Sequence, residues 1–127
     1  MSAAGRGILM GVGAAGPAMA KLRELGLVDC LRGLRQPMLG ICLGMQLLFE
    51  RSAEGEVDCL GVLPGKILRF PDTPGLTVPH MGWNKLRIIR SDCPLVAGIA
   101  DGQQAYYANS YYAPISEVTV ASTSYGV

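Results

Sequence analysis

The 127-residue chain has a single histidine, His80, and its four cysteines show no CxxC spacing. Because structural zinc is usually held by four cysteine or histidine ligands in closely spaced pairs, we expect no metal site. An excess of charge of one sign is also missing, since 11 lysines and arginines stand against 10 acidic residues, for a net charge of +1. Without a basic stripe, nucleic-acid binding has no electrostatic support.

Long apolar runs are missing too. No run approaches the roughly 18 residues that a membrane-spanning helix needs, and the first residues lack the apolar core of a signal peptide. These absences predict a cytoplasmic protein with free thiols and no membrane segment. We also expect no cofactor.

The apolar residues present are sufficient for one core. Hydrophobic residues make up 50% of the chain and charged residues 17%, which excludes a disordered protein. The length suits one domain, so we expect residues 1–127 to form a single domain. Many of the 17 glycines lie between short apolar runs, a pattern typical of α/β proteins with tight turns.

The first half of the chain alternates apolar runs with amphipathic segments. This pattern predicts strands at residues 7–10 and 37–41, and helices at 18–25, 28–34 and 44–50. Gly26 is the predicted C-terminal cap of the first helix. The order strand, helix, strand predicts that the two strands pair in parallel. The second half predicts only short strands, at residues 62–63, 66–70, 86–89, 105–112 and 118–122.

The candidate nucleophile is Cys42, in the segment Gly40-Ile41-Cys42-Leu43-Gly44 between a predicted strand and a predicted helix. Gly-x-Cys-x-Gly at such a junction is typical of a sharp turn that exposes a nucleophile. The helix start favours the thiolate, and the Leu43 N–H is suited to bind an oxyanion. The alternative is a buried structural cysteine, which is our interpretation of the other three cysteines.

Residues 40–50 resemble the nucleophile segment of the class I (triad) glutamine amidotransferases. Within that class the chain is most similar to the glutaminase subunits of imidazole glycerol phosphate synthases. Further segments agree in the family's order, at residues 11–14, 78–84, 109–114 and 121–126.

This resemblance implies an α/β fold, the flavodoxin-like three-layer sandwich of that class with a mixed sheet, here incomplete. The family's first strand–helix unit has no counterpart before Gly7. The His-Pro-Glu segment that holds the family's catalytic histidine and glutamate would follow the strand at residues 118–122. We therefore expect a partial domain, truncated at both ends.

The resemblance also implies the reaction. Cys42 attacks the side-chain amide of glutamine, a γ-glutamyl thioester forms, ammonia leaves and water releases glutamate. In the family the ammonia passes to a cyclase subunit, so the expected partner is that subunit in a heterodimer serving histidine biosynthesis.

Further site residues are carried over by the same resemblance. They are Leu43, Gly11, Val12 and Gly13 for the oxyanion, Gln46, Ser110 and Tyr111 for the glutamine pocket, and Trp83 and Asn84 for the partner interface. Structural alternatives stay open: Gln46 as a solvated helix residue, Ser110 and Tyr111 as an ordinary strand, and Trp83 as a core anchor.

A cysteine nucleophile needs a base, and His80 does not match the family's catalytic histidine. We therefore do not pair it with Cys42 and expect a structural or interface role. Loss of the base costs a factor of roughly 10²–10⁴, so we expect little turnover from these residues alone. Two alternatives remain, a non-catalytic fragment or interaction module and a cysteine hydrolase with another substrate.

Overall fold

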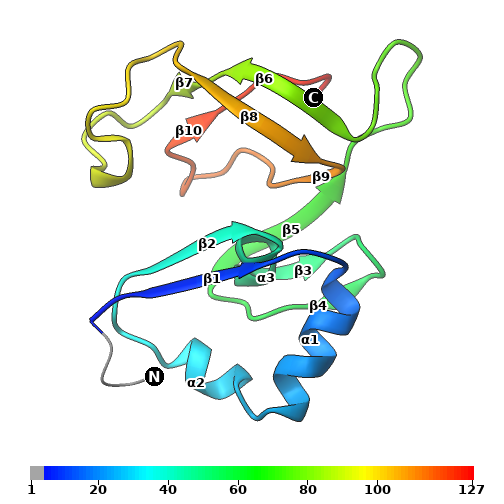
Figure 1. The fold of residues 1–127 in the computed structure, drawn as a ribbon, viewed down its shortest axis with the longest axis vertical. Coiled ribbons are helices and arrows are strands. Elements are labelled where there is room, and N and C mark those ends of the chain that lie inside the picture. The colour runs from blue at the N-terminus through cyan, green and yellow to red at the C-terminus, as the bar shows by residue number, and fades with distance from the viewer. Residues whose placement is uncertain (1–4) are drawn as a thin grey trace. The chain divides into compact units, whose positions relative to one another are not determined.

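The computed structural model describes residues 5–127. The chain divides into two compact units, Met1–Arg69 and Phe70–Val127, each of which is described by itself. In Figure 1 the first unit runs from blue to green and the second from green to red. The prediction of a single domain stays a prediction.

The first unit contains three helices and five strands among its described residues. In chain order they are β1 (Gly7–Gly11), α1 (Ala15–Glu24), α2 (Val28–Arg32), β2 (Met38–Cys42), α3 (Leu43–Leu48), β3 (Phe49–Ser52), β4 (Val57–Asp58) and β5 (Leu63–Arg69). β1 and β2 pair in parallel, with Gly7 opposite Met38 and Gly11 opposite Cys42. The predicted parallel pairing is confirmed, and both strands end at the same edge.

Helix α1 begins at Ala15, three residues earlier than predicted, and ends at Glu24. The predicted C-terminal glycine is confirmed, because Gly26 has φ 64°. Its N–H donates to the Arg23 carbonyl at 3.0 Å, and the Leu27 N–H donates to the Leu22 carbonyl at 2.9 Å. These two bonds form a Schellman motif, which satisfies carbonyls that the helix leaves free.

The prediction of a helix through residue 50 is wrong at its end, since α3 stops at Leu48 and Phe49 opens β3. The carbonyls of Leu47, Leu48 and Phe49 accept backbone N–H groups of Leu60, Val62 and Gly61. Tertiary hydrogen bonds therefore replace the next helical turn. β3 then pairs antiparallel with β4 and parallel with β5.

The core of the first unit lies where the helices pack on the inner face of β1 and β2. Its buried members are Ala15, Met19, Leu31, Leu43, Leu47, Leu48, Cys59 and Leu60. The opposite face of the strand pair carries exposed Ile8, Met10, Leu39 and Ile41. Parallel sheets usually bury both faces, so the described residues leave one apolar face of β1–β2 uncovered.

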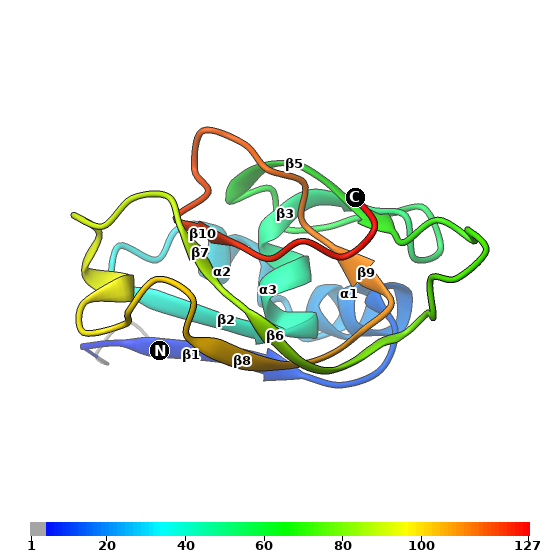
Figure 2. The ribbon, with the colours of Figure 1, turned by 90° about the horizontal axis from the view of Figure 1, so that it is seen from above.

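The second unit is built of short strands. They are β6 (His80–Lys85), β7 (Arg87–Ile88), β8 (Gln104–Asn109), β9 (Tyr111–Tyr112) and β10 (Ala121–Ser122), with a 3-10 turn at Pro94–Val96. β6 and β8 are antiparallel, with Trp83 opposite Tyr106, and run side by side in both views (Figure 1, Figure 2). β7 pairs antiparallel with β10.

Strand predictions for this unit are partly wrong. β6 was not predicted, because Pro79 and Gly82 suggest a turn. The strand predicted over residues 105–112 is interrupted at Ser110, whose carbonyl accepts the Phe70 N–H at 3.0 Å. The strands predicted at residues 86–89 and 118–122 shorten to two residues each.

An aromatic cluster forms the interior of the second unit around His80, which is only 5% exposed. Its imidazole stacks on Tyr125 with ring centroids 3.6 Å apart and on Tyr107 at 4.8 Å. Phe70 meets the same ring edge-on at 6.4 Å. Burial lowers the pKa of His80, since it disfavours the charged imidazolium. These contacts support the structural role expected for His80.

The low pKa of His80 predicts a loss of stability in acid. The unfolded chain takes up this proton near pH 6.5, whereas the folded chain does so only at lower pH. Stability is therefore lost as the pH falls below about 6.5, until the folded-state pKa is passed. Urea unfolding at pH 7.5 and 5.5 should show this loss, and His80→Phe should reduce it. A pH dependence unchanged by the substitution would contradict the assignment.

Candidate functional site

Cys42 lies at the junction of β2 and α3, as the sequence predicts. Its backbone has φ 52° and ψ −118°, and its side chain is exposed. A positive φ is uncommon for a residue other than glycine and costs of order 1–3 kcal/mol. The chain maintains this strain at the residue whose thiol is the predicted nucleophile.

The two glycines that flank Cys42 are required by close packing. A Cβ at Gly44 would lie 1.9 Å from the carbonyl oxygen of Leu9 on β1. A Cβ at Gly40 would lie 2.7 Å from the Cα of Met45 on α3. Real Cβ atoms do not approach so closely, so α3 packs this tightly against β1 and β2 only because both positions are glycine.

The predicted oxyanion residues lie beside the same junction. Gly11 is the register partner of Cys42, and the next residues form a turn, residues 11–14, called here the 11–14 turn. Val12 is 92% exposed in this turn, and Gly13 has φ 104°. The Leu43 side chain is buried, and its Cδ2 would be 3.6 Å from a Cβ at Gly11. The structure therefore places Gly11, the first residue of the 11–14 turn, beside Cys42 and the start of α3.

Gln46 follows Cys42 by about one turn of α3 and is 8% exposed, so the solvated alternative is wrong. Its Oε1 atom is buried and has no hydrogen-bond partner among the described residues. An unsatisfied buried polar atom costs roughly 1–3 kcal/mol. A ligand that donates a hydrogen bond would remove this cost, but the predicted contact with glutamine stays a prediction.

The remaining predicted site residues belong to the second unit. The Ser110 carbonyl bonds to Phe70, as described above, and the Tyr111 carbonyl accepts the Asn109 side-chain amide at 2.9 Å. Trp83 is 67% exposed and meets Tyr106 edge-on, with centroids 5.5 Å apart, so the core alternative is wrong. Asn84 donates to the Ser124 carbonyl at 3.1 Å. Their roles stay predictions.

Glu54 is not among the site residues that the sequence predicts. Its Oε2 atom accepts the backbone N–H of Ala15 at 3.0 Å, directly after the 11–14 turn. Glu54 lies 39 positions away in sequence, and the helix was expected to begin only at residue 18. Helix caps are predicted from the residues next to the helix start, so the sequence contains no signal for a cap this far along the chain.

Residues 5–127 contain no group of three or more histidine, cysteine or acidic side chains placed to hold a metal ion. All four thiols are free, and Cys59 is buried, which raises its pKa. No helix in the described range has both the length and the apolar character needed to cross a membrane.

The packing at Gly44 predicts a strong effect of one methyl group. Gly44→Ala should lower the free energy of unfolding by about 1–3 kcal/mol or more, because α3 or β1 must move to admit the methyl group. Gly16→Ala in α1 is the control, since its Cβ would meet only Val57 Cγ2 at 3.5 Å. It should be neutral or stabilise by up to about 1 kcal/mol. Equal effects in urea unfolding would contradict this account.

Comparison with known proteins agrees with the geometry. The family model for class-I glutamine amidotransferase matches residues 3–124. The imidazole glycerol phosphate synthase subunit HisH of Xylella fastidiosa (strain Temecula1) is 48% identical over 126 residues, which cover 99% of this chain and 62% of the relative. HisH of Xanthomonas campestris pv. campestris (strain 8004) is 51% identical, with the same coverage.

The chain thus spans 62% of the length of these relatives. The family match covers nearly the whole chain and includes Cys42 and the 11–14 turn. The predicted α/β class, with parallel and antiparallel strand pairs, is confirmed as well. The chain belongs to the class-I glutamine amidotransferase family.

Proposed function

We propose that this chain is the glutamine-hydrolysing part of an imidazole glycerol phosphate synthase. The observation that carries the proposal is the strained, exposed Cys42, with the 11–14 turn beside it, in a chain about half identical to HisH proteins. A general family likeness alone would leave the substrate open, whereas the relatives' names specify a subunit of one synthase.

In the proposed reaction the Cys42 thiolate attacks the side-chain carbonyl carbon of glutamine. The carbonyl oxygen becomes an oxyanion, for which the Leu43 N–H and the 11–14 turn are the proposed donors. Collapse of this intermediate breaks the C–N bond, and the nitrogen takes up a proton and leaves as ammonia. Water then cleaves the γ-glutamyl thioester to give glutamate and the free thiol.

Gln46, Ser110 and Tyr111 are each proposed as glutamine-binding residues. Support comes from the unpaired Gln46 Oε1, which an amide or ammonium donor of the substrate would satisfy. The backbone of residues 110–111 would supply further contacts.

His80 is not the base in this proposal. It is the only histidine of the chain, and its ring is stacked between two tyrosines in the second unit. No histidine of these residues is then available to move the proton, which supports the expected low turnover of the chain by itself.

The proposed partner is the cyclase subunit, bound through the outer face of β6 and β8. That face exposes Met81, Trp83 and Tyr106. Asn84 follows Trp83 on β6 and is the other interface residue that the resemblance implies. Exposed apolar patches mark interfaces, and tryptophan, tyrosine and methionine are enriched in them. The free thiols fit the cytoplasm, where such a heterodimer would work.

The second candidate function is a non-catalytic interaction module. It is favoured by the same shortage of histidine, together with the exposed β6–β8 face. A cysteine hydrolase of another substrate has less support, since the relatives share one name over 99% of the chain.

Selective labelling tests the proposed substrate. The glutamine analogue 6-diazo-5-oxonorleucine should modify Cys42, glutamine should protect it, and Cys42→Ser should abolish the reaction. Cys30 is also exposed and serves as the internal control: iodoacetamide should modify both thiols, the analogue only Cys42. Peptide mass spectrometry reads both sites. Equal modification of the two cysteines by the analogue would argue for a hydrolase of another kind or for a module.

The rate of glutamine hydrolysis tests whether the chain contains a catalytic base. The 127-residue chain should release glutamate roughly 10²–10⁴ times more slowly than an amidotransferase that has a positioned base. Cys42→Ala measures the background. A Cys42-dependent rate of about 1 s⁻¹ or more, within the usual range of enzymes, would show that another group acts as the base.

A further inference from the structure

The start of α1 has no cap of its own. The Ala14 side chain makes no cap hydrogen bond, and the first turn contains no acidic residue. Ala15 is fully buried, so water cannot satisfy its N–H. The carboxylate of Glu54 accepts that N–H instead, and a negative charge at a helix N-terminus strengthens such a bond.

Glu54 is itself held by the sheet of the first unit. It lies in a turn between β3 and β4, residues 52–57, called here the 52–57 turn. The Glu54 N–H donates to Ser52 Oγ at 3.1 Å, and Ser52 is fully buried. The neighbouring Ala53 N–H donates to the carbonyl of Ile67 on β5 at 2.9 Å. The carboxylate therefore projects from a backbone that two strands anchor.

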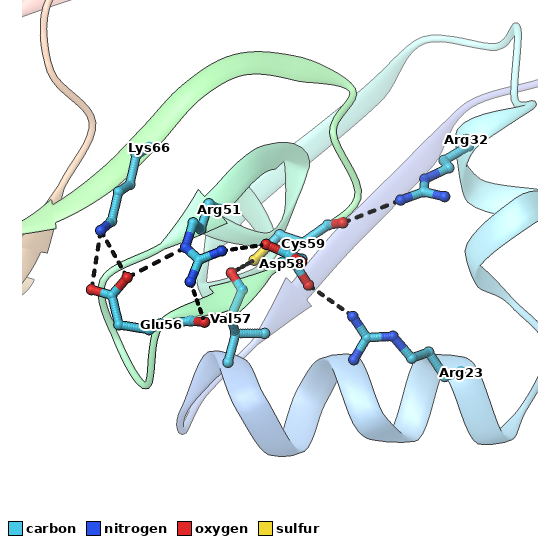
Figure 3. Close-up of polar contacts among 8 residues, drawn as sticks. All are labelled: Arg23, Arg32, Arg51, Glu56, Val57, Asp58, Cys59 and Lys66. Atoms are coloured by element: carbon cyan, nitrogen blue, oxygen red, sulfur yellow. Dashed lines mark hydrogen bonds and ion pairs between the residues drawn. The ribbon is translucent and has the colours of Figure 1, made fainter.

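Charged side chains fix the other side of the 52–57 turn, as Figure 3 shows. Lys66 Nζ lies 2.9 Å from one carboxylate oxygen of Glu56 and 3.0 Å from the other. Arg51 reaches the Glu56 backbone carbonyl at 3.0 Å and Asp58 at 2.8 Å. The hydrogen bond from Lys66 is the main reason that the pKa of Glu56 is lowered. One exposed pair contributes little, but several together hold the conformation at Glu56, where φ is 51°.

The 11–14 turn is thus held at both ends. At one end Gly11 is paired with Cys42 in the parallel register. At the other end Ala15 is bonded to Glu54, and Gly16 packs beside Val57. Between these ends Val12 is almost fully exposed, so the ends determine where its N–H points.

We propose that Glu54 is a positioning residue for the 11–14 turn: through Ala15, it holds the turn's backbone N–H groups at Cys42. Its value for the reaction rests on the proposed function, because only an oxyanion at Cys42 needs those groups. The hydrogen bond to Ala15 does not depend on that function. Oxyanion donors act best when their positions are set before the reaction.

The test compares Glu54→Ala and Glu54→Gln with matched changes at Glu24, an exposed glutamate at the other end of α1. Amide hydrogen exchange at residues 12–15 should accelerate roughly tenfold in Glu54→Ala, the order expected for one charged hydrogen bond. Glu54→Gln keeps an acceptor oxygen and should recover most of the protection. The Glu24 variants should leave these amides unchanged.

The second readout is the modification of Cys42. In Glu54→Ala the maximal rate of Cys42 modification by 6-diazo-5-oxonorleucine should fall about tenfold. The analogue concentration that gives half of this rate should change little, and the rate with iodoacetamide should stay the same. Glu54→Gln should restore most of the rate. A change only in the analogue concentration at half-maximal rate would overturn the positioning role, because it would indicate that Glu54 contacts the analogue directly.

The two proposals fail separately. If the analogue does not label Cys42 selectively in the unmodified chain, the proposed function fails, and amide exchange still decides the role of Glu54. If exchange at residues 12–15 is the same in the Glu54 and Glu24 variants, the positioning role fails. Should Glu54→Ala not fold, Glu54→Leu takes its place, because leucine is close to glutamate in size and has no acceptor oxygen. Exchange in Glu54→Leu at the level of the Glu24 variants overturns the inference.

Discussion

The contact between Gly44 and the Leu9 carbonyl is the constraint on which the site depends. α3 approaches β1 so closely that no side-chain carbon fits between them. This approach places the start of α3 at the edge where β1 and β2 both end. Cys42 has its positive φ at this edge, and Gly11, at the start of the 11–14 turn, is its register partner. Close packing of α3 on β1 therefore limits the geometry available to the predicted nucleophile.

Polar contacts then stabilise the surroundings of that packed centre. The carboxylate of Glu54 satisfies the start of α1, where neither Ala14 nor the first turn supplies a side-chain cap. The 52–57 turn behind it is anchored to β5 through Ala53 and bordered by the ion pairs of Lys66 and Arg51. In the first unit, the strained backbone at Cys42, the Glu54 cap of α1 and the surface ion pairs therefore lie on consecutive, hydrogen-bonded segments.

Sequence patterns located the elements with a clear period and missed those that depend on distant partners. The strands at β1 and β2, the helix α1 and the terminal Gly26 follow from apolar spacing and glycine chemistry. The first two residues of β3, Phe49 and Glu50, are predicted as helix because residues 47–49 are apolar and suit either form. Only the hydrogen bonds from Leu60, Gly61 and Val62 decide between them. The sequence does not predict β6, because Gly82 suggests a turn. The strand forms nevertheless, because its backbone pairs with β8.

The sequence by itself identified the family and predicted Cys42 as the nucleophile, because both depend on residue types at fixed short spacings. Only the tertiary structure decided that His80 is buried among tyrosines, that Gln46 carries an unpaired oxygen and that Trp83 is exposed. It alone joined Glu54 to Ala15 across 39 positions. Burial and distant hydrogen bonds arise from the folding of the chain, and no local spacing encodes them.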